Sequence, residues 1–240
     1  MNSKGFKALV ILISLALVSS AGAFAMVGTS SRAVAADNQW IAVPAWLAGT
    51  WQTRVQTFLE VYDYRTEQQL VKEPTDIQVS RLRTVGAQQD ATGQIWHYVA
   101  TPFMRNSETE THFESQTIQR LSVLQSDANL LSLRTDGVVS RWSKETRQKI
   151  DNFYEITIAT YIPLYSGRIK TDLQVADYDT NGRPLRLSHS MCVERCVKPF
   201  AAIDRDERGD LHEKFLRFMA ERNVASKQSG APSLQSPSTR

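Results

Sequence analysis

Apolar and polar residues alternate along most of the chain between residues 49 and 197. Trp51, Val55 and Val61, for example, alternate with Gln52 and Arg54, which is the pattern of a half-buried strand. Further strand-like segments follow at residues 77–85, 95–99, 112–124, 130–139, 154–162, 169–175 and 185–193. No helical run separates these segments. The sequence therefore predicts a mainly β fold, an antiparallel up-and-down barrel or half-barrel of about eight strands.

The segments before and after this β region lack the alternating strand pattern. Residues 37–48 are rich in aromatic residues and predict an irregular entry segment or a brief helical turn. Beyond residue 200, an apolar stripe at helical spacing predicts an amphipathic helix from Asp210 to Asn223 that packs on the outside of the sheet. The stripe consists of Leu211, Phe215, Phe218 and Met219. We therefore expect a barrel domain at 37–200, a C-terminal helical segment at 201–224 and a disordered tail at 225–240.

The first residues have the pattern of an export signal. Lys4 and Lys7 precede an apolar run from Ala8 to Val18, and the small residues 33–36 supply a cleavage site. The sequence predicts a signal peptide at residues 1–36 and an extracytoplasmic protein, in the periplasm or an equivalent lumen. Cleavage after Ala25 is an alternative. A second alternative is an uncleaved anchor, because residues 8–28 are long enough to span a bilayer.

Removal of residues 1–36 changes the charge of the chain. This segment carries three basic residues and no acidic one, so the 28 basic residues fall to 25 and equal the 25 acidic ones. A nucleic-acid partner would require a basic stripe, which the remaining sequence does not show. We therefore expect no nucleic-acid partner.

The beginning of the first predicted strand resembles the opening of the lipocalin and calycin superfamily. In that superfamily a G-x-W stands at the start of the first barrel strand, and Gly49 and Trp51 match it. The resemblance implies a barrel that holds one small apolar ligand, such as a lipid or a pigment. It also implies an arginine that packs on Trp51, for which Arg186 is a candidate.

Aromatic residues on the predicted strands are the other indication of ligand binding. With Arg186, the candidate binding residues are Trp51, Trp96, Tyr98, Phe113 and Tyr154. The alternative is that these aromatic side chains simply fill the core. Arg81, Arg83 and Arg134 are candidates for holding a carboxylate at the mouth of the barrel, or are ordinary outward-facing residues.

Cys192 and Cys196 are the only cysteines, and disulfides persist outside the cytoplasm. We therefore expect a Cys192–Cys196 disulfide. Residues four apart on one strand lie about 13 Å apart, and a disulfide needs Cα atoms within about 7 Å, so this expectation requires the strand to end near Cys192. The alternatives are reactive thiols or a soft-metal site formed by His189, Cys192 and Cys196.

The sequence contains no motif of nucleophilic catalysis, phosphate-loop binding or dinucleotide binding. We therefore expect no cofactor and favour an exported, non-enzymatic protein that binds a small apolar ligand. A scaffold or assembly factor for an envelope or membrane complex is the second hypothesis. The third is a barrel-based enzyme of unknown reaction. We expect membrane contact only if the signal segment stays uncleaved.

Overall fold

The computed structural model describes residues 38–229, apart from residues 109, 166 and 208. The predicted signal peptide and residues 230–240 of the predicted tail lie outside the described residues.

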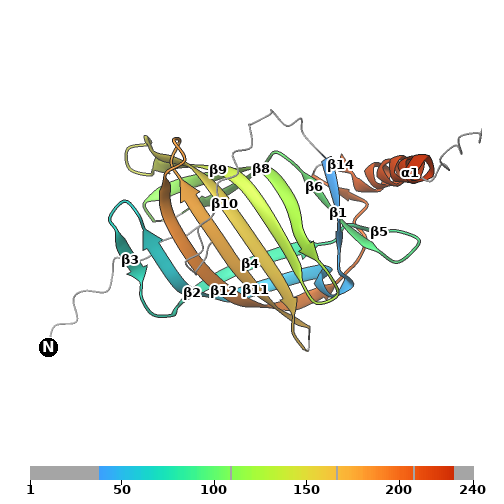
Figure 1. Cartoon of the computed structure of the whole chain (residues 1–240), viewed down its shortest axis with the longest axis horizontal. Coiled ribbons are helices and arrows are strands. Elements are labelled where there is room, and N and C mark those ends of the chain that lie inside the picture. Colours follow the sequence, from blue (N-terminus) through green and yellow to red (C-terminus); the bar gives the residue numbers. More distant parts are fainter. Residues whose placement is uncertain (1–37, 109, 166, 208, 230–240) are drawn as a thin grey trace, which may run out of the picture.

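A curled antiparallel sheet forms most of the molecule (Figure 1). From one side to the other its strands are β2 (Gly49–Asp63), β12 (Pro184–Pro199), β11 (Arg168–Tyr178), β10 (Lys149–Pro163), β9 (Leu131–Ser143), β8 (His112–Ser126) and β7 (Phe103–Glu108). On the other side of β2, β3 (Gln68–Val71) and β4 (Thr75–Val85) pair with successive parts of that strand. The sheet is therefore eight strands wide, and the prediction of an antiparallel half-barrel of about eight strands is confirmed.

Contacts between strands that are not neighbours show how strongly the sheet curls. The guanidinium of Arg83 on β4 lies 4.4 Å from the ring centre of Tyr161 on β10, although β2, β12 and β11 stand between these strands. Gln116 of β8 donates a hydrogen bond of 2.5 Å to Glu155 of β10 across Gly137 of β9. Because Gly137 has no side chain, it leaves room for this contact on the concave face.

A small second sheet covers one end of the half-barrel. It consists of β1 (Asn38–Val43), β6 (Ile95–Ala100) and β5 (Gln88–Gln89), in that spatial order. A 3₁₀ turn, η1 (Ala45–Leu47), connects β1 to β2. One face of the small sheet enters the main core, in which Ile41, Val43, Ile95 and Val99 pack with Trp51, Leu131 and Ile169. The segment expected to be irregular or a helical turn is thus a strand followed by a turn.

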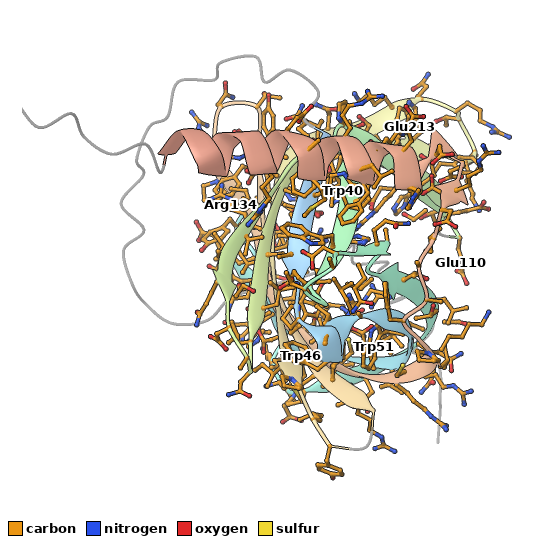
Figure 2. The ribbon with its side chains drawn as sticks, turned by 90° about the vertical axis from the view of Figure 1, so that its right-hand side faces the viewer. Trp40, Trp46, Trp51, Glu110, Arg134 and Glu213 are labelled. Carbon is orange, nitrogen blue, oxygen red and sulfur yellow. The ribbon has the colours of Figure 1, made fainter. Side chains whose placement is uncertain are left out.

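The opposite face of the small sheet carries the helix α1 (Leu211–Ser229), which lies at the other end of the molecule from β3 (Figure 1). Leu211 and Phe215 are buried against Trp40, which lies beneath the helix (Figure 2). The short hairpin of β13 (Arg205–Asp206) and β14 (Gly209–Asp210) precedes α1. Asp210 accepts a hydrogen bond of 2.8 Å from the amide of Glu213 and so caps the helix. The predicted amphipathic helix is confirmed, and it continues past residue 224.

Candidate functional site

The edge strand β4 turns its charged residues inward and an apolar residue outward. Arg81 and Arg83 share a face with Val85, which is part of the main core. Leu82, between the two arginines, is 67% exposed. A half-buried strand normally places apolar side chains on the inner face. This inversion therefore brings two guanidiniums onto the concave face of the half-barrel.

The other edge strand, β7, shows the same inversion. Phe103 packs against the main core, and Arg105, two residues further on, lies on the same face of the strand. Met104 points outward and is 65% exposed. The two edges of the sheet thus both direct arginine side chains toward the space that the sheet encloses.

Arg83 is neutralised by a buried carboxylate. Its Nε and Nη2 donate hydrogen bonds of 3.0 Å to the two carboxylate oxygens of Glu194 on β12. Glu194 also accepts a hydrogen bond from the hydroxyl of Thr171. Burial lowers the pKa of Arg83, but the neighbouring Tyr161 and Glu194 outweigh this and raise it. Arg83 therefore has a structural role that joins β4 to β12.

Arg81 and Arg105, which we call the arginine pair, lack such a partner. Among residues 38–229 as described, neither has a carboxylate within 4.0 Å. Arg81 donates a hydrogen bond of 2.9 Å to the side chain of Gln56, which is itself held by Ser190. Desolvation lowers the pKa of Arg105, and the positive charges of Arg81 and Arg83 also lower it, whereas the charges of Tyr161 and Glu155 oppose this and raise it. Neither guanidinium of the arginine pair therefore has a direct carboxylate partner within the described residues, although Glu155 contributes a nearby negative charge at Arg105.

An apolar floor lies on the same face. Phe103, Leu121, Leu133 and Tyr161 are partly buried and pack against the main core. They come from β7, β8, β9 and β10, so they are consecutive across the sheet. The concave face thus combines an apolar surface with two guanidiniums that lack a direct carboxylate partner in the described part of the chain, an arrangement that suits a ligand with an anionic head and an apolar body.

A second group of charges is buried deeper along the concave face. Glu114 pairs with Arg141 at 2.6 Å, and Asp177 pairs with Arg186 at 2.9 Å. With Glu155, which is 2% exposed, Glu114 and Asp177 form what we call the buried acid cluster. Three carboxylates thus face two guanidiniums, so one negative charge is in excess.

The surroundings of Glu155 favour the neutral form of its side chain. Desolvation and the negative charge of Asp177 raise the pKa of Glu155 well above its ordinary value. Its Oε1 accepts hydrogen bonds from Gln116 and Thr157, whereas its Oε2 has no partner. Desolvation also raises the pKa of Asp177, against the opposing effect of Arg186.

Trp51 and Arg186 do not meet. Trp51 lies beside η1, where its indole nitrogen donates a hydrogen bond of 2.7 Å to the carbonyl of Leu47. Arg186 lies opposite Asp63, toward the other end of β2. The arginine opposite Trp51 is Arg83 of β4.

The other aromatic candidates are spread over different surfaces. Trp96 and Tyr98 pack beneath α1, on the side of the small sheet that faces away from the half-barrel. Phe113 lies next to Lys144 and Arg147, and Tyr154 is nearly half exposed. The structure therefore does not bring these four side chains together on the concave face. Arg134 points outward and pairs with Asp136 at 2.7 Å.

The expected Cys192–Cys196 disulfide is wrong, because both cysteines are free. The strand β12 does not end near Cys192 but continues to Pro199. Residues four apart on a continuous strand lie about 13 Å apart, roughly twice the Cα separation that a disulfide spans. Burial raises the pKa of the Cys192 thiol to about 11, which makes it a poor nucleophile.

The alternative metal site at these cysteines does not form either. The His189 ring nitrogen Nε2 lies 3.0 Å from Asp172, and strand alternation places His189 on the face opposite Cys192. The described part of the chain contains no group of three His, Cys, Asp or Glu side chains suited to a metal ion.

The sequence indicated Arg81 and Arg83 but not Arg105, Gln56 or Glu194. Arg105 could have been found from the order Phe103-Met104-Arg105. Residues two apart on a strand share a face, so the arginine lies on the same face as the aromatic residue. Gln56 meets Arg81 through the pairing of β2 with β4, and Glu194 meets Arg83 across β2. Both contacts join segments that are far apart in the sequence, so no local pattern predicts them.

Comparison with protein-family models, curated proteins and solved structures found no match to this chain. Within the described residues, no helix is long and apolar enough to cross a membrane.

Proposed function

We propose that the chain is a non-enzymatic binding protein whose concave face holds a small amphiphile. In this proposal the arginine pair binds a carboxylate head, and the apolar floor contacts the body of the ligand. One observation carries it: Arg81 and Arg105 reach the concave face from the two edges of the sheet without a carboxylate partner. A guanidinium pairs with a carboxylate through two parallel hydrogen bonds, so the pair is suited to such a head group.

The proposal retains the expected apolar ligand and adds an anionic head group to it. We also propose that the chain is calycin-like in architecture. Support for that likeness comes from Gly49 and Trp51 at the start of β2 and from the burial of Trp51 beside η1. We propose that the protein acts outside the cytoplasm, after removal of residues 1–36.

Calorimetric titration with dodecanoate tests this function, using protein produced from the full chain. Dodecanol, which has the same chain length but no charge, is the matched ligand. We expect dodecanoate to bind saturably and dodecanol to bind more weakly. Replacing both arginines, Arg81→Gln and Arg105→Gln, should weaken dodecanoate binding by about tenfold or more, since each removes a charge-assisted hydrogen bond.

Arg134→Gln is the control, because it removes one positive charge from the outer face and should leave dodecanoate binding unchanged. Equal affinity for dodecanoate and dodecanol would contradict the role of the arginine pair. Absence of binding to both ligands would contradict the proposed function itself.

A further inference from the structure

The outer face of the sheet contains a groove where β2 and β12 separate. The two strands pair at Thr57 with Met191 and again at Gln52 with Arg195, but their ladder is interrupted between these points. The interruption opens a groove of about 450 Å³. It lies on the opposite face of the sheet from the arginine pair, so it is a different site from the one to which we assign the amphiphile.

Three exposed arginines from three strands line this groove: Arg54 of β2, Arg168 of β11 and Arg195 of β12. Within the described part of the chain, none of the three has a carboxylate within 4.0 Å, and Arg54 donates only to the side chain of Gln52. Arg168 and Arg195 are direct partners across the β11–β12 ladder. Like charges that face each other in this way destabilise a sheet. An anion held between them would remove that cost.

Three acidic side chains of the described residues lie at or beside the groove, and one of them, Asp76, accepts a hydrogen bond of 2.7 Å from the groove-lining Thr57. The other two are bound by basic groups. Glu194 contributes to its lining, but its carboxylate is bound by Arg83 and Thr171. Asp172 pairs with His189 and lies 3.8 Å from Lys170. Neither carboxylate is therefore available to neutralise the three guanidiniums.

We infer that this outer groove binds a phosphate group. Arg168 and Arg195 would hold it from two adjacent strands, and Arg54 would close the third side. A phosphate group offers three acceptor oxygens and more than one negative charge, so it can satisfy three guanidiniums where a carboxylate has oxygens for only two. Arginine also matches phosphate oxygens through bidentate hydrogen bonds.

Two sources can supply this group, free phosphate or the head group of a phospholipid. Val193 and Val197 flank Arg195 on the same face of β12 and are 50% and 43% exposed. An exposed apolar surface therefore lies beside the proposed phosphate site. The experiment below separates the two sources.

The protein produced from the full chain is titrated with inorganic phosphate at constant ionic strength, and its binding to phosphatidic acid vesicles is measured beside phosphatidylcholine vesicles. We expect saturable binding to phosphate or to phosphatidic acid. The double variant Arg168→Gln/Arg195→Gln should weaken that binding by about tenfold or more. Binding to phosphate in solution indicates a soluble ligand, and binding only to phosphatidic acid vesicles indicates a lipid head group.

Two double variants serve as controls. Arg120→Gln/Arg134→Gln removes the same charge from the outer face of β8 and β9 and should leave binding unchanged. Arg81→Gln/Arg105→Gln, which tests the proposed function, should also leave it unchanged. The inference is overturned if neither probe binds, or if the Arg120/Arg134 variant loses as much affinity as the Arg168/Arg195 variant.

Discussion

At the scale of single residues, Glu155 makes the stability of the protein dependent on pH. Its pKa in the folded state is raised by desolvation and by Asp177, whereas in the unfolded chain it has its ordinary value. Below the unfolded pKa, Glu155 is protonated in both the folded and the unfolded chain, and the free energy of unfolding is not reduced by its ionisation. As the pH rises above the unfolded pKa and through the folded pKa, Glu155 ionises first in the unfolded chain. The unfolded chain is thereby favoured, and the free energy of unfolding falls.

The substitution Glu155→Gln keeps the shape and the accepting oxygen of this side chain but cannot ionise. We expect it to raise the free energy of unfolding at pH 8 by about 1–3 kcal/mol, because the variant no longer loses stability when this position ionises in the unfolded chain. At about pH 4 the variant and the original protein should have nearly equal stability. Urea unfolding at both pH values measures this. A variant less stable at pH 8 would show that the Glu155 carboxylate is ionised and stabilising in the fold.

At the scale of elements, the extended course of β12 fixes the state of the two cysteines. We expect an intact mass that corresponds to two thiols, and an unchanged melting temperature when a reducing agent is added. In the folded protein, iodoacetamide should modify the partly exposed Cys196 before the buried Cys192, whose thiol pKa is about 11. Mass spectrometry after brief labelling measures both results. A mass two hydrogens lower would instead show that β12 bends between these residues.

The contact between α1 and the small sheet provides another prediction for an element. The ring of Phe215 lies 5.0 Å from that of Trp40 and is almost fully buried. Phe215→Ala should therefore lower the free energy of unfolding by about 3–5 kcal/mol. Leu216→Ala, at the next position and 55% exposed, is the matched control and should change it by less than about 1 kcal/mol. Thermal and urea unfolding check both. Equal effects would mean that α1 does not hold this face in solution.

The sequence predicts an element well when residues that are close together in the chain mark it, and poorly when the element depends on distant contacts. The apolar stripe of α1 was predicted correctly, because a spacing of three to four residues is a local feature of the sequence. The strand β1 was missed. Its residues are buried between α1 and the half-barrel, so it lacks the alternation of polar and apolar residues that marks a half-exposed strand.

At the scale of the whole molecule, a curled half-barrel of about eight strands was predictable, but its exact strands and the contacts that the curl creates were not. The predicted strand at 95–99 lies in the small sheet, and β3 and β7 of the main sheet were not predicted. The curl depends on contacts such as that of Arg83 with Tyr161, which are far apart in the sequence. It also depends on Gly137, where an added Cβ would lie 2.8 Å from the carbonyl oxygen of Thr117. The curl decides which charges meet, and for this reason the arginine pair and the buried acid cluster could not be assembled from the sequence.

The interruption between β2 and β12 also has a consequence for how the molecule opens. Backbone amides in a continuous ladder are protected from exchange with deuterated solvent, whereas amides outside a ladder exchange through smaller openings. Within residues 53–56 and 192–194, the amides that point across the interruption, and not those paired with β4 or β11, should therefore exchange faster than the paired amides at both of its ends. Mass spectrometry of peptides measures this difference in exchange rate. A clear difference would show that the sheet is weakest between β2 and β12. The half-barrel could then open locally between β2 and β12 without unfolding. Uniformly slow exchange along both strands would show that they stay together in solution.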